Sequence, residues 1–161
     1  MLKGGNFSPF KSIYIPAEDI MAKNKNSRST AREIAFKLLF EDMFGTSTAQ
    51  SMLGVLFDEE VNWNNISQEN ESYIQWIREK TKEHQEQLDK IISDFAKGWK
   101  LERMSRVDVS ILRLAICEII YREDVTNAIA INEAVELAKK YSSDDAPQFI
   151  NGILGAYVRS L

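Results

Sequence analysis

The stretch SRVDVSILRLAICEIIY, residues 105–121, decides the fold of this 161-residue chain. Its apolar residues recur with the 3.6-residue period of an α-helix and cover well over half of the circumference: Val107, Ile111, Leu112, Leu114, Ala115, Ile116, Ile119 and Ile120. A helix that is apolar on nearly all sides must be surrounded by other segments of the protein. The pattern therefore predicts the central helix of an all-helical domain, with Ser105 as its cap.

The rest of the chain also has helical periodicity. Thr30 and Glu33 form a capping-box pattern, which predicts that the first helix begins at Thr30 and ends at Gly45. Further helices are expected at about 48–57, over 67–96 with a break near His84, and over 127–141. Pro147 fits the first turn of a last helix, with Asp144 or Asp145 as its cap.

Composition limits the class of protein. A net charge of -4 and a pI of about 5.2 argue against indiscriminate binding to nucleic acid, although they allow a local basic patch. No apolar run reaches the roughly 20 residues that span a bilayer, and no secretory signal opens the chain. The single cysteine, Cys117, lies in the apolar helix, where a buried and unreactive thiol is expected. These features favour a cytoplasmic protein without a membrane segment.

The first 26 residues differ in composition from the rest and are expected to form a flexible extension to a domain at 27–161. Glycines and prolines punctuate this opening, and Met21 has the appearance of a natural start. Two interpretations of the first twenty residues stay open. They are either an upstream addition or a segment that packs on the domain through Phe7, Phe10, Ile13 and Tyr14.

The sequence has no motif for catalysis or cofactor binding. It contains no glycine-rich phosphate loop, no cysteine pair at zinc spacing and no HExxH sequence. His84 stands between Glu83 and Glu86, but a solvated helix face explains this group better than a metal site, which needs convergent buried ligands. We therefore expect a protein that is not an enzyme and holds no metal or cofactor.

A basic cluster precedes and opens the first helix: Lys23, Lys25, Arg28, Arg32 and Lys37. Guanidinium groups and helix N-termini both bind phosphate well. Arg28 and Arg32 are expected to share one face, directed to water and away from Ile34 and Leu38. A solvated basic tail remains the alternative to a phosphate-binding cluster.

Three ordered motifs resemble the NusB family of bacterial transcription antitermination factors. They are SRSTAREIAFKLLF at 27–40, WKLERMSRVDVSILRLAICEII at 99–120, and AINEAVELAKKY at 130–141 followed by FINGIL at 149–154. The resemblance implies a compact all-helical domain of about seven helices in two small bundles. It also implies a function without catalysis. The family pairs with NusE, a protein of the small ribosomal subunit, to bind boxA RNA and build an antitermination complex on RNA polymerase, with a possible role in ribosomal RNA synthesis.

The resemblance also implies site residues. Arg28 and Arg32 match the arginine-rich start of the family, although Ser29 and Thr30 replace part of its arginine run. Asp145 and Phe149 match positions in the RNA-facing region, and Phe40 and Asp108 match positions near the NusE contact. Each of these last four has a structural alternative, since Phe40 and Phe149 are at core spacing and Asp108 and Asp145 stand at helix starts.

Two other functions remain open at this stage. The domain would also serve as a helical protein-interaction module without RNA contact. The same fold occurs at the N-terminus of certain ribosomal RNA cytosine methyltransferases, but the sequence ends at Leu161 without a cofactor-binding domain, so this enzyme function would require a fragment.

Overall fold

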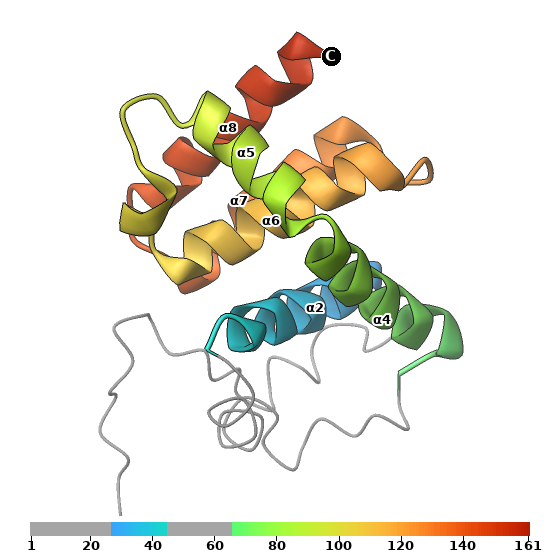
Figure 1. Cartoon of the computed structure of the whole chain (residues 1–161). Helices are drawn as coiled ribbons and strands as arrows, with labels where there is room; N and C mark the ends of the chain where they lie inside the picture. Colours follow the sequence, from blue (N-terminus) through green and yellow to red (C-terminus); the bar gives the residue numbers. More distant parts are fainter. Residues whose placement is uncertain (1–26, 45–65) are drawn as a thin grey trace, which may run out of the picture.

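A computed structural model describes residues 27–44 and 66–161. Over these residues the chain forms six α-helices, one 3-10 helix and no strand, which confirms the all-helical prediction. The elements are α2 (Arg28–Asp42), α4 (Gln68–Glu83), α5 (Gln85–Phe95), η2 (Leu101–Arg103), α6 (Arg106–Tyr121), α7 (Asn127–Tyr141) and α8 (Ala146–Ser160) (Figure 1). None of the described helices has the length and apolar character needed to cross a membrane. The expected extension at 1–26, with Lys23 and Lys25, and the expected helix at 48–57 lie outside the described residues.

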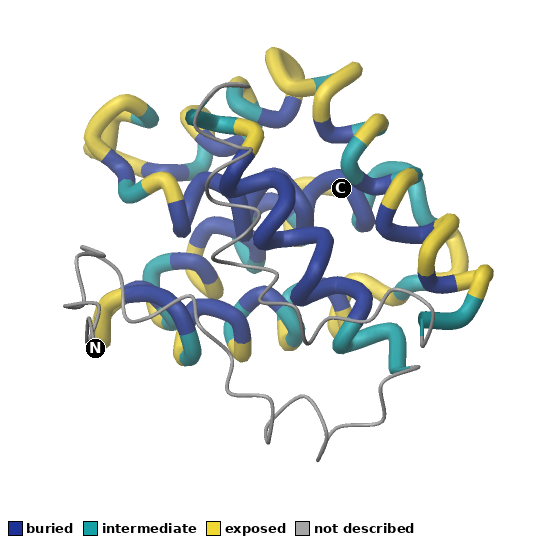
Figure 2. The backbone as a smooth tube through the Cα atoms, turned by 90° about the horizontal axis from the view of Figure 1, so that it is seen from below, coloured by how far each residue is buried: buried dark blue, intermediate teal, exposed yellow. Residues whose placement is uncertain are grey.

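Helix α6 is the centre of the fold, as its apolar pattern predicts. It contacts every other described α-helix, and its residues are buried without interruption from Val107 to Glu118. Ser105 caps it by accepting a hydrogen bond from the Asp108 N–H. Cys117 is fully buried, and burial raises the pKa of its thiol to about 11. In Figure 2 the buried positions, in dark blue, continue through the middle of the molecule.

The other helices form two groups that share α6. Helices α2 and α4 pack against each other and against α6, while α5, α7 and α8 form a second group with it (Figure 1). Helix α2 runs antiparallel to α6, because Arg32 near its start pairs with Glu118 and Met43 after its end lies 3.2 Å from Ser110 Oγ. The fold therefore agrees with the expected pair of small bundles.

Among the described helices, the predicted boundaries hold except at the first one. The break between α4 and α5 falls at His84, and α7 has the expected bounds. The predicted start of α2 is wrong by two residues, because Ser27 is the cap and its Oγ accepts the Thr30 N–H at 3.1 Å. Glu33 accepts hydrogen bonds from Lys140 and Tyr141, which join α2 to α7.

Helix α2 is buried as thoroughly as α6, although it is much less apolar. Every residue from Ala31 to Glu41 is buried, including four charged ones: Arg32, Glu33, Lys37 and Glu41. Burial lowers the pKa of Lys37 to about 8, even though Glu33 nearby opposes this shift. A helix can bury charged side chains if they pair with opposite charges or if their pKa values shift toward the neutral form. Helix α2 shows both, since Arg32 and Glu33 have charged partners and the pKa of Lys37 is lowered.

Glu41 provides a test of this burial. Its side chain is 0% exposed, and neither carboxylate oxygen has a hydrogen-bond partner among the described residues. Burial, with a smaller contribution from Asp42, raises the pKa of Glu41 to about 7. A carboxyl group with a raised pKa in the folded state binds its proton more tightly there, so its ionisation costs stability as the pH rises from about 4.5 through 7.

We therefore expect Glu41→Gln to stabilise the protein by roughly 1 to 3 kcal/mol at pH 8 and by much less near pH 5. Urea unfolding at the two pH values measures the difference. The exposed Glu86→Gln variant is the matched control, since it removes one carboxylate from α5 without touching the core. A gain for Glu41→Gln of the same size at both pH values would contradict a buried, titrating carboxyl group.

Candidate nucleic-acid interface

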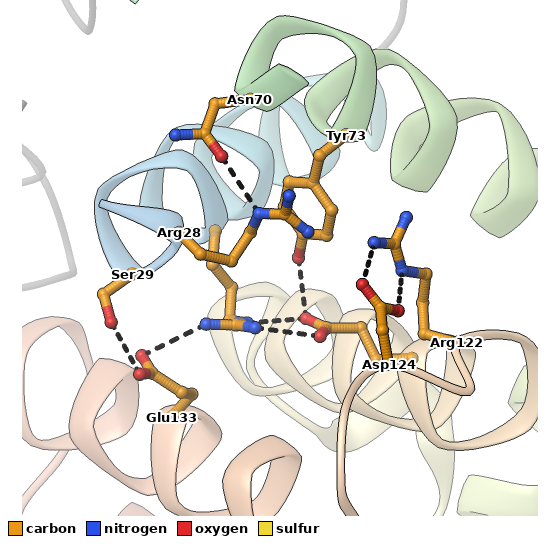
Figure 3. A network of polar contacts seen from close by, with 9 residues as sticks. Arg28, Ser29, Asn70, Tyr73, Arg122, Asp124 and Glu133 are labelled. Carbon is orange, nitrogen blue, oxygen red and sulfur yellow. Dashed lines mark hydrogen bonds and ion pairs between the residues drawn. The ribbon is translucent and has the colours of Figure 1, made fainter. Parts of the chain in front are cut away.

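Arg32, an expected phosphate contact, is instead the centre of a buried ion-pair network. Its Nε lies 2.6 Å and its second guanidinium nitrogen 3.0 Å from the two Glu118 oxygens, and the guanidinium also lies 3.6 Å from Glu133. The Tyr73 hydroxyl donates to Glu118 at 2.7 Å, and the Ser29 hydroxyl donates to Glu133 at 2.6 Å (Figure 3). Burial by itself lowers the pKa of Arg32, but the hydrogen bond to Glu118 and the nearby acidic groups outweigh it, so the pKa is raised.

This network corrects the expectation that Arg32 faces water. Its side chain is 3% exposed, and that of Glu118 is 0% exposed. The reason is the position of α2, which packs against α4 and α6 and whose Ser29 and Glu33 side chains bond to residues of α7. Arg32 therefore holds the two bundles together from inside and offers no side chain to a ligand in this conformation.

Arg28 is placed differently and stays partly accessible. Its side chain is 25% exposed, its guanidinium carbon lies 4.4 Å from the centre of the Tyr73 ring, and its Nε donates to Asn70 at 3.0 Å. The ion pair from Arg28 to Glu69 measures 3.2 Å and involves a carboxylate that is 87% exposed. Such an exposed pair contributes little to stability and is easily exchanged for another anion.

Arg122 joins Arg28 at this end of the molecule, and the sequence motifs did not single it out. Its guanidinium lies 5.0 Å from the Trp76 ring centre and 5.5 Å from that of Tyr73, and it forms a two-pronged pair with Asp124 (Figure 3). The hydrogen bonds from Arg122 lower the pKa of Asp124. Within the described residues this end of the molecule is thus balanced, because each of the three arginines faces at least one carboxylate.

The second group of predicted residues lies at the start of α8. Asp145 occupies the N-cap position, but its exposed side chain makes no capping hydrogen bond. Phe149 is half-buried, packs partly on the core, and meets Trp99 with 5.8 Å between the ring centres at an interplanar angle of 68°. Both Asp145 and Phe149 line an open groove of about 560 Å³ between the end of α5 and α8. The structure therefore places these two residues in the lining of one groove.

The connection from α5 to α6 adds a cationic surface that the motif analysis missed. Residues 97–106, KGWKLERMSR, hold four basic residues against one acidic residue, and we call them the basic segment. Its cations, Lys97, Lys100, Arg103 and Arg106, are all exposed, and none forms an ion pair with another described residue. The signal was present in the sequence as a local charge excess around a tryptophan, but helical periodicity does not reveal it.

The two residues matched to the partner contact are used inside the fold. Phe40 is 1% exposed and meets Phe44 edge to face with 5.0 Å between ring centres. Asp108 is 8% exposed and accepts a 2.6 Å hydrogen bond from Ser142, which ties the start of α6 to the end of α7. Core packing, the alternative that the sequence left open for Phe40, is the arrangement observed. Asp108 stands in the first turn of α6, but the cap is Ser105, and the Asp108 side chain bonds to α7 instead.

The two candidate surfaces lie at opposite ends of α6. Arg28 and Arg122 lie near its C-terminal end, whereas Asp145, Phe149 and the basic segment lie near its N-terminal end (Figure 1). A helix of 16 residues is about 24 Å long, so one compact ligand does not reach both surfaces. An extended polymer does.

Neither surface has the parts of a catalytic or metal centre. Among the described residues no three His, Cys, Asp or Glu side chains converge as metal ligands. The buried polar groups at the start of α2 are paired with one another. Over the described residues the chain is thus a small helical protein with two surfaces that combine cationic and aromatic side chains.

The chain belongs to the NusB family, since the model of that family matches residues 29–159. Transcription antitermination protein NusB of Natranaerobius thermophilus is 41% identical over 140 residues, which cover 84% of this chain and 96% of that protein. Members of the family are antitermination factors and not enzymes, in agreement with the prediction.

Solved structures show the same fold. T. maritima NusB superposes with a TM-score of 0.70 at 28% identity, covering 83% of this chain and 92% of that one. A chain from a crystal structure of the antitermination factors NusB and NusE in complex with double-stranded RNA superposes with a TM-score of 0.67 at 29% identity, covering 83% and 97%. These likenesses extend well beyond the three motifs, because they include α4 and α5.

Proposed function

We propose that this protein is a cytoplasmic transcription antitermination factor that binds boxA-type single-stranded RNA together with NusE. In this proposal the pair helps to assemble an antitermination complex on RNA polymerase and promotes ribosomal RNA synthesis. The observation that carries the proposal is membership of the NusB family over nearly the whole described chain, together with a relative of the same fold in a complex with NusE and RNA.

The geometry supports an RNA strand that extends along the molecule. Proteins that hold single strands combine cations that follow the backbone with aromatic faces that stack on bases. The two surfaces supply both kinds of group, about one length of α6 apart. The partly exposed Arg28 is the phosphate contact proposed at one end, with Lys23 and Lys25 preceding it in the chain, and Asp145 and Phe149 are the contacts proposed at the other end.

The roles of Arg32, Phe40 and Asp108 are proposed to be indirect. Arg32 positions the start of α2, and hence Arg28, through its pairs with Glu118 and Glu133. Through Ser142, Asp108 fixes the end of α7, which is followed by α8, beside the start of α6. NusE is proposed to dock around the N-terminal end of α6, where Asp108 lies, without direct contact to the Phe40 ring.

Replacement of Arg28 tests the phosphate contact. Arg28→Ala is expected to weaken binding to boxA-type RNA by roughly five- to tenfold, about 1 to 1.4 kcal/mol, because one charge-assisted contact is lost. The slope of log affinity against log salt should fall by about one unit. Fluorescence anisotropy over a salt series, in the presence of NusE, measures both quantities.

Arg78→Ala is the matched control for this prediction. Arg78 also belongs to a partly exposed arginine–carboxylate pair that joins α4 to α2, but its partner Asp42 lies at the far end of α2 from Arg28. This control should keep the affinity and salt slope of the unmodified protein. Equal salt slopes for Arg28→Ala and the unmodified protein would count against a phosphate contact at Arg28.

A further inference from the structure

The groove between the end of α5 and α8 contains an aromatic surface that the fold itself does not need. Trp99 is 58% exposed, and among the described residues it is the only aromatic one in the group of large exposed hydrophobic side chains. Its only described ring contact is the edge-to-face approach to Phe149, which leaves most of the indole in contact with solvent. Burial of an indole normally stabilises a fold, so an exposed one beside a groove marks a surface for a ligand.

Local backbone geometry holds Trp99 in this position. Gly98 has a φ of 78°, in the left-handed region that glycine adopts without strain, and it turns the chain sharply after the α5 C-cap at Ala96. The Trp99 N–H then donates to the Ala96 carbonyl at 2.9 Å, which closes the turn. The exposed indole is therefore fixed at the mouth of the groove by a defined turn.

The opposite wall of the groove is hollow because α8 carries small residues there. Gly152 and Ala156 line the groove one turn apart, and a Cβ atom added at Gly152 would have no atom within 4 Å. The volume of the groove, about 560 Å³, falls within the range of small-molecule sites, so the groove has room for a planar ring.

The polar groups around the groove identify the kind of ring. Lys97 and Arg159 line it, and Lys100 follows Trp99 directly in the chain, so the groove has cationic residues among its lining and next to it in sequence. Asp145 and Gln148 also line it and provide a hydrogen-bond acceptor and an amide that both donates and accepts. These groups match the parts of one unpaired nucleotide. Cations can bind its phosphates, the indole can stack on its base, and the polar groups can form hydrogen bonds with the edge of the base.

We propose that this groove holds one unpaired base of the bound RNA, stacked on Trp99 and read at its edge by Asp145 and Gln148. The adjoining phosphates lie on Lys97, Lys100 and Arg159. This proposal rests on the proposed RNA-binding function and adds a base-binding site formed by Trp99 and the hollow at Gly152. It commits to RNA as the occupant, because the local excess of cations suits a polyanion.

Two variants test the site in opposite ways, one by removing the stacking face and one by filling the hollow. Trp99→Ala is expected to weaken binding of boxA-type RNA by about 5- to 150-fold, and Trp99→Phe by clearly less. The salt slope should stay unchanged in both, since no phosphate contact is lost. Gly152→Leu keeps Trp99 but occupies the hollow, and it should weaken binding without loss of thermal stability because helix propensity improves.

Ile129→Ala is the matched control for removal of an exposed apolar side chain, since Ile129 is 48% exposed on α7 and does not line the groove. Its RNA affinity should equal that of the unmodified protein. A second measurement uses RNA with 5-iodouridine at successive positions, cross-linked by light in the NusE-containing complex. Peptide mass spectrometry should then place a cross-link on Trp99 for one position of the RNA.

The outcomes separate this site from the general function. Failure of the unmodified protein to bind RNA, with or without NusE, would overturn both the proposed function and the site. Tight binding by the unmodified protein, with equal affinity for Trp99→Ala and Gly152→Leu, would overturn only the base-binding groove. Loss of NusE binding by Trp99→Ala at unchanged RNA affinity would also overturn it, since the groove would then be a protein contact.

Discussion

Replacement of Arg32 by alanine is expected to lower the free energy of unfolding by about 3 to 5 kcal/mol. The guanidinium forms two hydrogen bonds to Glu118, whose side chain is 0% exposed. Without Arg32 this carboxylate stays inside the protein with only the Tyr73 hydroxyl as a described hydrogen-bond partner. A buried charge without a counter-charge costs far more than a lost surface ion pair. Urea unfolding followed by circular dichroism measures the loss.

Two controls separate the buried charge from the loss of side-chain volume. Arg28→Ala removes an arginine one turn earlier on the same helix, but its carboxylate partner, Glu69, is 87% exposed, so the change should cost less than about 1 kcal/mol of stability. Arg32→Met combined with Glu118→Leu removes both charges and should recover much of the stability lost by Arg32→Ala. A stability for Arg32→Ala within about 0.5 kcal/mol of the unmodified protein would show that the pair does not hold the bundles together.

The sequence identifies α6 as central because its pattern is extreme. A helix that is apolar on all sides has only one place in a folded domain, so burial of Ile111 and Leu114 follows from sequence alone. Two of its few charges have partners in other helices, since Arg113 pairs with Asp89 at 2.7 and 2.9 Å and Glu118 pairs with Arg32.

Helix α2 shows where sequence patterns fail. Arg32, Glu33, Lys37 and Glu41 resemble a solvated face, because periodicity records which residues are apolar and not which charges have partners far along the chain. The partner of Arg32 is 86 residues away, and that of Glu33 is 107 residues away. Only the packing of α2 between α4, α6 and α7 brings these pairs together.

The candidate site also has residues that the sequence could identify and residues that it could not. Asp145 and Phe149 were expected to act together, and they line one groove. Trp99 lies in the connection between α5 and α6, and a residue in a connection has no periodicity from which its exposure can be predicted. The left-handed Gly98 and the small residues of α8 decide that exposure, and both act through three-dimensional structure.

The central claim is that this protein recognises RNA as one half of a complex. Its net charge is -4, and the arginines at the start of α2 are balanced by carboxylates, so its own attraction to RNA is small. NusE is expected to add contacts on the same strand. Two linked contacts raise the effective affinity by roughly 100- to 10,000-fold without strengthening either one.

The direct measurement is a fluorescence anisotropy titration of labelled boxA RNA with this protein, in the absence and presence of NusE, beside a scrambled RNA of equal length and composition. The proposed function predicts weak binding by the protein alone and at least tenfold tighter binding with NusE, for boxA RNA and not for the scrambled strand. Equal affinity with and without NusE, or for boxA and scrambled RNA, would contradict it.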